Sequence, residues 1–326
     1  MVQLFRKNWF VFTLLLFPYT ILTRVWVFFG TPNWPINIEN PSVAYKFLDQ
    51  HLPGTYIWNV MLASFIIFLN AVIINHIVIK NRIAREINLY PGMLFILLTS
   101  IHKDMFWVSP HLISVSFLSI GISSVFRVYQ KPNASIHLFN TGFFVGLSTM
   151  FFSPHFLFLI FAFLSTATLR KIKFRDFIQI LVGFVLVFLF GLFFRFWNYG
   201  DVQIMPGFSE QFSWVFSINN IKLNELLIFL LLLILTISSF IYYRKFTIKK
   251  SIQSQKKVNL IYWILFFGIL CLSFNLNKML FSGLIILILP LSICGSMLMN
   301  RFKNDLGLEL LHFFILFFII FSHFWF

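Results

Sequence analysis

Long apolar segments alternate with short polar ones along the entire chain. These segments lack the period-2 alternation of a membrane barrel strand, and a backbone in lipid must satisfy its own hydrogen bonds. A helix of about 20 apolar residues meets both conditions. The pattern therefore predicts an all-α, polytopic membrane protein with about eleven transmembrane helices. Their approximate spans are 9–29, 58–79, 89–101, 110–126, 137–152, 154–169, 177–197, 223–243, 258–274, 280–299 and 310–326.

Three of these segments, 89–101, 137–152 and 154–169, are short for a bilayer core of about 30 Å. The pairs 89–126 and 137–169 are therefore either tilted hairpins that cross the membrane or hairpins that are partly re-entrant. The chain has eleven spans in the first case and nine or seven in the second. Both flanks of each pair stay on one side in either case, so the charge pattern does not distinguish these counts.

The first apolar segment also has a feature of a secretory signal peptide, because Arg6 and Lys7 precede it. Its length exceeds the roughly 7–15 residues of a signal-peptide core, and no small-residue cleavage site follows it. Instead it is rich in Phe and Trp and runs into Gly30–Pro32. We interpret it as a retained first helix.

The basic residues orient the predicted helices. With a cytoplasmic N-terminus, about three quarters of the 25 Lys and Arg residues fall in inside loops, as the positive-inside rule requires. We therefore predict a multi-pass protein of the bacterial inner membrane with its N-terminus in the cytoplasm. The basic residues left on the outer side are Arg24, Lys46, Lys103, Arg195, Lys222 and Lys278.

Composition adds little about function. The net charge of +15 does not indicate nucleic-acid binding, because the basic residues form short clusters between apolar segments. The strongest cluster, 244–257, is expected to orient the chain and contact anionic lipid. We attribute the 48 Phe residues to codon usage. Cys271 and Cys294 lie inside apolar segments without metal-binding spacing, so no metal or cofactor is expected.

Two long outer loops, 30–57 and 198–222, mix Pro, Gly, Trp and acidic residues. Within the first, residues 41–51 have the pattern of a short amphipathic helix on the membrane surface. We expect Tyr45 and Leu48 on this helix to face lipid or the helix bundle.

Two other outer turns share the triplet Ser-Pro-His, at 109–111 and 153–155. Ser followed by Pro is typical of a helix start, with Ser as the N-cap and Pro in the first turn. The outer histidines have no HxxH spacing, so we interpret them as helix-start or interfacial residues rather than metal ligands. They are His51, His102, His111 and His155.

Polar side chains inside the apolar segments include Asn70, Asn75 and Gln179. Buried polar groups commonly join membrane helices through hydrogen bonds. We expect that role for these residues, with a substrate-lining role as the alternative.

Three carboxylates on the predicted outer side, Glu39, Asp49 and Asp104, are candidates for catalysis. Glycosyl transfer from a lipid-phosphate donor needs a carboxylate to deprotonate the acceptor hydroxyl, and cations to stabilise the departing phosphate. The cations near the outer helix ends are Arg24, Lys103 and Arg195. The alternative is that all six are interfacial residues whose side chains reach toward lipid head groups.

The layout resembles the N-terminal module of the GT-C class, membrane glycosyltransferases that use polyprenyl-phosphate sugars. One helix, a long acidic outer loop with a surface helix, and then paired shorter helices carry the likeness, most of it within 58–131. The resemblance implies a base in the first outer loop, Glu39 or Asp49, and a second acid at Asp104. The chain departs from that class in having no adjacent acidic pair in the first loop and no large soluble C-terminal domain.

The chain also looks like a family of Phe-rich bacterial inner-membrane proteins of similar length, a likeness that implies no activity. The GT-C resemblance covers residues 1–197, a transmembrane module with outer loop 30–57. Residues 198–326 add an outer loop and the C-terminal transmembrane helices.

The leading hypothesis is an inner-membrane, GT-C-like glycosyltransferase that acts at the outer face on a polyprenyl-phosphate sugar. Asp49 is the first choice as base, with His51 orienting it, Glu39 is the second choice, and Arg195 is expected to face the same cavity. The alternative is a non-catalytic subunit that binds membrane lipid and other membrane proteins in a cell-envelope complex. A transporter is disfavoured because the chain shows no clear inverted repeat.

Overall fold

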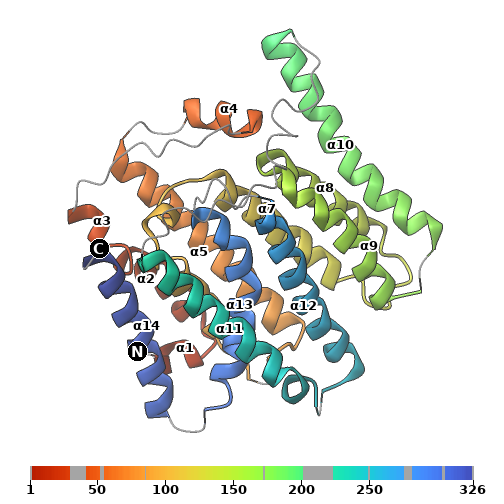
Figure 1. Cartoon of the computed structure of the whole chain (residues 1–326). Helices are drawn as coiled ribbons and strands as arrows, with labels where there is room; N and C mark the ends of the chain where they lie inside the picture. The colour runs from red at the N-terminus through yellow and green to blue at the C-terminus, as the bar shows by residue number, and fades with distance from the viewer. Residues whose placement is uncertain are drawn as a thin grey trace.

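A computed structural model describes most of the chain (Figure 1). The described residues are 2–29, 42–51, 55–84, 86–171, 173–200, 223–248, 250–274, 281–302 and 305–324. Within them every regular element is a helix. The α-helices are α1 (Val2–Arg6), α2 (Phe10–Leu22), α3 (Trp26–Phe29), α4 (Val43–His51), α5 (Tyr56–Lys80), α6 (Tyr90–Leu98), α7 (Pro110–Phe126), α8 (Ser135–Phe151), α9 (Leu157–Leu169), α10 (Phe174–Tyr199), α11 (Leu223–Thr247), α12 (Ile252–Ser273), α13 (Ile285–Met299) and α14 (Asp305–Phe324). Short 3₁₀ turns are η1 (Lys103–Met105), η2 (Ser153–Phe156) and η5 (Phe281–Leu284).

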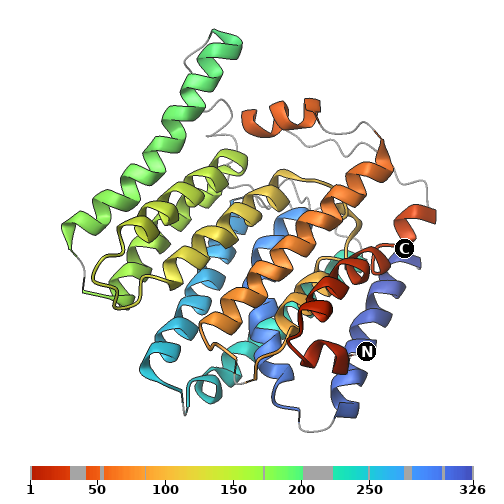
Figure 2. The ribbon, with the colours of Figure 1, turned by 180° about the vertical axis from the view of Figure 1, so that it is seen from behind.

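Five described helices are long and apolar enough to cross a membrane: α5, α10, α11, α12 and η5 joined to α13. Every regular element of the described residues is helical, and the length and composition of these five helices suit a membrane protein, as the apolar pattern predicts. α10 and α11 lie at the periphery, because only 22% and 17% of their apolar windows are buried. At the centre, all of α6 and all but one residue of α13 are buried, and α5 crosses the middle of the bundle (Figure 2).

The prediction of a single first helix over 9–29 is wrong. The structure breaks this segment into α2 and α3, with a turn at 23–25 between them. In the turn the backbone N–H of Arg24 donates to the carbonyl of Ile21 at 3.0 Å. The break directs the Arg24 side chain into the protein interior, where it is fully buried.

α6 has nine residues, about 13 Å of helix, and so cannot cross a bilayer core of about 30 Å alone. Its flanks extend it, and the segment 88–104 runs antiparallel to η5 and α13. At one end the Asn88 side chain donates to the Asn300 side chain at 2.5 Å. At the other end the backbone N–H of Phe281 donates to Asp104 at 3.3 Å. This short segment therefore extends as far as the buried α13 helix beside it.

The loops predicted to share the inside lie together at one end of the bundle, along the lower and right-hand edges in Figure 1. We call this the basic end, because Lys and Arg side chains connect its loops. The connecting contacts are Arg6 with Glu86 (3.6 Å), Arg170 with the Lys131 carbonyl (3.0 Å), Lys257 with Asn81 (2.7 Å), Arg301 with the Lys245 carbonyl (2.9 Å), and Lys250 with the Ile83 carbonyl.

The opposite end carries α4, and we call it the α4 end. Here the Tyr45 hydroxyl donates to the Val108 carbonyl at 2.7 Å, and Ser322 donates to the Ile101 carbonyl at 3.1 Å. Consecutive described loops therefore lie at alternating ends of the bundle, as they do in the predicted order of helices.

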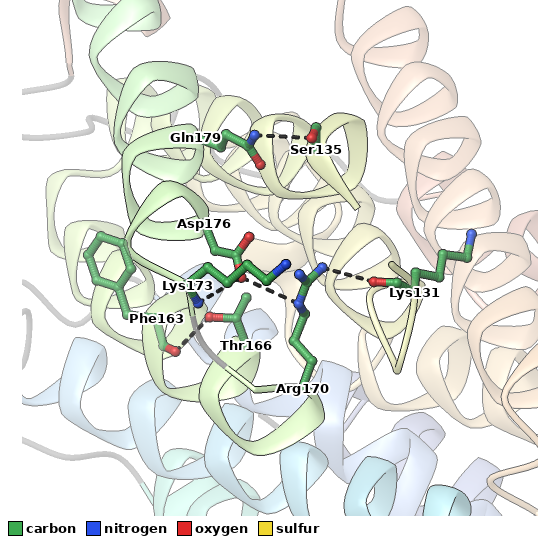
Figure 3. A network of polar contacts seen from close by, with 8 residues as sticks. All are labelled: Lys131, Ser135, Phe163, Thr166, Arg170, Lys173, Asp176 and Gln179. Atoms are coloured by element: carbon green, nitrogen blue, oxygen red, sulfur yellow. Dashed lines mark hydrogen bonds and ion pairs between the residues drawn. The ribbon is translucent and has the colours of Figure 1, made fainter. Parts of the chain in front are cut away.

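A polar network fixes the loops around α8, α9 and α10 at the basic end (Figure 3). Asp176 and Arg170 form an ion pair at 3.3 Å with both side chains less than a tenth exposed. The carboxylate also accepts the backbone N–H of Lys173 at 3.2 Å. Gln179 donates to Ser135 at 3.0 Å, which confirms its predicted helix-joining role.

Two asparagines of α5 join this helix to its neighbours, as predicted. Asn70 donates to Ser116 at 2.7 Å and accepts from Ser119 at 3.1 Å, both on α7. Asn75 accepts the backbone N–H of Gly92 on α6 at 2.7 Å. Each hydrogen bond satisfies a polar group for which lipid tails would offer no hydrogen-bonding partner.

α8 and α10 pack with their backbones in close approach. Gly142 and Gly146 on α8 have the small-xxx-small spacing typical of close membrane-helix pairs. A Cβ at Gly142 would overlap the carbonyl oxygen of Ile180, and one at Gly183 on α10 would overlap the carbonyl oxygen of Phe139. The absence of side chains at these positions sets the distance between the two helices.

We expect Gly142→Ala to destabilise the purified protein by about 2–3 kcal/mol, because the added methyl group meets backbone rather than a movable side chain. Thermal unfolding in detergent measures the change. Gly307→Ala is the control, since its nearest contact, 3.2 Å away, is the half-exposed ring of Phe302. Equal melting temperatures for Gly142→Ala and the parent protein would contradict the packing described.

Candidate functional site

The loop 99–109 between α6 and α7 gathers polar side chains at the α4 end. The His102 ring stacks on Phe281, with centroids 4.2 Å apart. Nδ1 of His102 accepts the backbone N–H of Asp104 at 3.1 Å, which leaves the ring proton on Nε2 when the histidine is neutral. The same Nδ1 lies 3.5 Å from the Asp104 carboxylate. The two side chains thus form a compact acid–imidazole pair.

The Asp104 carboxylate is largely enclosed but not sealed. Its side chain is 20% exposed and that of His102 is 13% exposed. Burial raises the pKa of Asp104 above its ordinary value, while the N–H of Phe281 and the charge of Lys103 act in the opposite direction. A carboxylate with a raised pKa that keeps contact with solvent is a stronger base than an exposed aspartate.

Arg24 is fully enclosed, which differs from the lipid-facing position expected of it. Its guanidinium donates to the Thr20 carbonyl (3.1 Å) and to both the carbonyl and hydroxyl of Thr99 (3.3 and 2.9 Å). It also lies 5.7 Å from the ring of Phe106. In this arrangement Arg24 joins the end of α2 to the end of α6 and supports the loop 99–109 from within.

Helix ends supply the negative charge opposite this cation. Thr20 is in the last turn of α2 and Thr99 is the C-cap of α6. A helix C-terminus carries about half a negative charge, so two of them together balance about one guanidinium. The arrangement explains why this buried arginine is stable without a carboxylate among its described hydrogen-bond partners.

The other candidate residues are placed separately. Lys103 is exposed beside Asp104, and Asp49 is exposed on α4. Arg195 is half-buried on α10, and Phe47 of α4 packs against its neighbour Phe194 with centroids 4.7 Å apart. α4 therefore brings Asp49 to the same end of α10 as Arg195. Glu39 lies outside the described residues.

The helix predicted within 41–51 is present as α4, with bounds Val43–His51; its position on the membrane surface stays a prediction. Tyr45 is buried against the bundle and Leu48 packs on the core, as expected. The expected role of His51 is wrong, because its Nδ1 bonds the Phe47 carbonyl at 2.8 Å, one helical turn back, instead of orienting Asp49.

The two Ser-Pro-His turns lie close together, and the Phe152 ring lies between their histidines. The centroid of Phe152 is 4.5 Å from that of His111 and 5.0 Å from that of His155. Ser109 is an N-cap that accepts from Leu112 at 3.2 Å, as predicted. The matching prediction for Ser153 is wrong, because Phe152 is the N-cap there and the turn is a 3₁₀ turn.

These histidines do not make a metal site. Among the described residues no group of three His, Cys, Asp or Glu side chains is close enough to hold a metal ion. Ser148 and Nδ1 of His155 hydrogen-bond at 2.5 Å, and the Cys271 thiol donates to the Pro154 carbonyl at 3.2 Å. These polar groups of the second turn are satisfied within the protein.

Sequence reasoning missed two contributors to the site, Thr99 and Phe281. Thr99 ends α6, and a threonine after an apolar run is too common a pattern to indicate an arginine partner. Phe281 is one of 48 phenylalanines, so nothing in its local sequence distinguishes it. Only the return of the chain through η5 places its ring against His102.

Comparison with known proteins found no match: no protein-family model, no curated protein and no solved structure matches the chain.

We expect the stability difference between Asp104→Asn and the parent protein to depend on pH. The folded-state pKa of Asp104 is raised, so its contribution is most favourable below the ordinary carboxyl pKa and is lost as pH rises through the raised value. Asn keeps an acceptor for the Phe281 N–H without ionising. The variant should therefore gain stability relative to the parent as pH rises from about 4 to about 8, as measured by melting temperature. A constant difference would contradict the burial of the carboxylate.

Proposed function

We propose that this chain is a GT-C-like membrane glycosyltransferase that transfers a sugar from a polyprenyl-phosphate donor at the α4 end. The observation that carries the proposal is the His102–Asp104 pair, a partly exposed carboxylate that accepts the N–H of Phe281 and lies 3.5 Å from Nδ1 of the imidazole. A cation for the departing phosphate, Lys103, is exposed beside it.

In the proposed reaction the acceptor hydroxyl oxygen attacks the anomeric carbon of the sugar. The bond from that carbon to the donor phosphate breaks, and the phosphate leaves with the electron pair. The Asp104 carboxylate takes the hydroxyl proton, and Lys103 stabilises the phosphate charge. Asp104 is favoured over Asp49 as base, because Asp49 is exposed and the nearby His51 is bonded elsewhere.

The orientation of the chain belongs to the same proposal. The basic end faces the cytoplasm and the α4 end faces outward, as the positive-inside rule favours. The membrane is the bacterial inner membrane, and segments 89–101 and 110–126 form a crossing hairpin. The contact of 88–104 with the full length of η5 and α13 supports the crossing form over the re-entrant one.

A non-catalytic membrane subunit is the second candidate. α10 stands at the edge of the bundle and extends beyond α8 and α9 (Figure 1). Its outer half exposes large aromatic side chains, including Phe190, Phe193 and Trp197. Such a face suits contact with another membrane protein as well as contact with lipid.

Reporter fusions test the orientation. A reporter that is active only in the cytoplasm should be active at every basic-end position, and a periplasmic reporter should be active at the α4 end, because Lys and Arg oppose translocation. A periplasmic signal within 244–257 would overturn the orientation. The cytoplasmic fusion points are Arg85, Lys131, Arg175, Lys257 and Lys303, and the periplasmic ones are Asp49 and Gln211.

Mutants in a deletion strain test the reaction, with the pool of polyprenyl-phosphate sugars measured by mass spectrometry. Donor should accumulate in the deletion strain and return to normal with the parent gene. Loss of a general base costs about 10²–10⁴-fold in rate, so Asp104→Asn should leave the donor accumulated at normal protein level.

Glu225→Gln is the matched control, because it removes a carboxylate from α11 instead of the pair. Full rescue by the triple variant Glu39→Gln, Asp49→Asn and Asp104→Asn would end the enzyme proposal in favour of the subunit. Rescue by Asp104→Asn with failure of Asp49→Asn would instead move the base to α4.

A further inference from the structure

A pocket whose charged lining residues are all basic opens at the basic end, at the opposite end of the bundle from the His102–Asp104 pair. It lies between the ends of α11 and α13 and is partly open to solvent. Of the residues that the structure describes around it, three are cationic and none is acidic. The lining residues are Lys245, Phe246, Lys250, Met297, Asn300 and Arg301.

All three cations are held in place rather than free in solvent, and the Lys245 ammonium lies 4.9 Å from the ring of Tyr242. The Arg301 guanidinium lies 5.3 Å from the ring of Tyr242 and 5.4 Å from that of Phe246. It uses one N–H group on the Lys245 carbonyl at 2.9 Å, and a guanidinium has five such groups. Lys250 is bonded to the Ile83 carbonyl. These side chains are therefore already ordered, so binding a ligand would cost little additional conformational entropy.

A neutral donor also lies at the pocket. The side-chain oxygen of Asn300 accepts from Asn88 at 2.5 Å, which fixes the orientation of the amide. Its Nδ2 is buried and has no acceptor among the described residues. A buried amide donor without an acceptor is costly, and an anion in the pocket would satisfy it.

Helix ends alone do not balance these charges. The C-termini of α11 and α13 both lie here and contribute about half a negative charge each. Three cations against about one negative charge leave an excess of about two positive charges. A phosphate monoester carries about −1.5 to −2 at neutral pH, so its charge matches this excess better than that of a phosphodiester.

We propose that this pocket binds a phosphate monoester, in the form of a phospholipid head group of the leaflet at the basic end. The surrounding sequence favours lipid, because Ile248, two residues from Phe246, and Phe302, which follows Arg301, are 47% and 46% exposed. Basic pockets at the ends of membrane helices bind anionic head groups in this way. A soluble phosphate ester shares the recognised group and is the competing source.

The full chain in phosphatidylcholine nanodiscs allows a direct test. Phosphatidic acid supplies a monoester, phosphatidylglycerol supplies a phosphodiester, and native mass spectrometry measures the lipid retained. Phosphatidic acid should bind more tightly than phosphatidylglycerol. Displacement by glycerol phosphate would assign the pocket to a soluble ester, and retention against glycerol phosphate would assign it to the lipid. Equal retention of the two lipids would overturn the proposal.

Matched variants separate the pocket from the general charge of the region. Lys245→Gln with Arg301→Gln should weaken phosphatidic acid binding about tenfold or more, since hydrogen bonds to charged groups are lost. Arg244→Gln with Lys256→Gln removes two charges from the same segment outside the lining and should weaken binding less than about twofold. Equal losses in both double variants would overturn the site.

If the double variant Lys245→Gln with Arg301→Gln fails to fold, the uncharged substitution Asn300→Ala tests phosphate binding instead. It removes the buried donor without changing charge, so binding should fall several-fold while retention of phosphatidylglycerol stays unchanged. Parent-like binding of phosphatidic acid by Asn300→Ala would overturn the proposal.

Discussion

A nine-residue helix buried on every side is the constraint on which this structure depends. α6 exposes none of its residues, so the backbone groups left over at its two ends need partners from the protein. At its start the N–H of Gly92 donates to Asn75 of α5. At its end the Thr99 carbonyl accepts from Arg24. Satisfying these groups places α5 and the break between α2 and α3 around α6, and α13 packs along its remaining side.

The same need recurs throughout the chain, which has 25 basic residues but only 10 acidic ones. Most cations cannot find a carboxylate, and the ends of helices take its place. Arg24 bridges the ends of α2 and α6, Lys257 bonds the C-cap of α5, and Arg301 bonds a carbonyl in the last turn of α11. A helix C-terminus attracts positive charge, so these contacts fix helix ends while neutralising the cations. The pocket between α11 and α13 keeps a positive excess among its described lining residues.

The position of the candidate catalytic pair follows from α6 as well. The loop 99–109 is anchored by Arg24 beneath it, by Phe281 beside it and by Tyr45 above it. An acid–imidazole pair on an anchored loop is held in one geometry, which is what proton transfer requires. α10 lies outside this anchored centre and exposes large aromatic side chains near its C-terminal end, such as Phe193 and Trp197. The bundle thus combines a rigid centre with a peripheral helix open to lipid or to another subunit.

Hydrophobic periodicity and charge by themselves determined the helical class, most helix bounds and which loops share an end. The bounds of α5 and α7 agree with the predicted spans to within about two residues, because in lipid the length of an apolar run sets the length of the helix. The surface helix α4, the helix-joining amides and the Ser109 cap were also predicted, since each depends on neighbours a few residues away. Glu39 remains a prediction, outside the described residues.

Tertiary structure alone decided the contacts between distant segments. Nothing near Arg24 in sequence indicates that its partner is Thr99, and nothing near His102 indicates Phe281. The assignment of His51 to Asp49 failed for the same reason, since proximity in sequence said nothing about the carbonyl one helical turn back. The local sequence predicts which segments form helices, how those helices are capped and which of their faces are apolar. Which cation reaches which helix end, and which carboxylate stays partly open to solvent, depends on packing across the whole bundle.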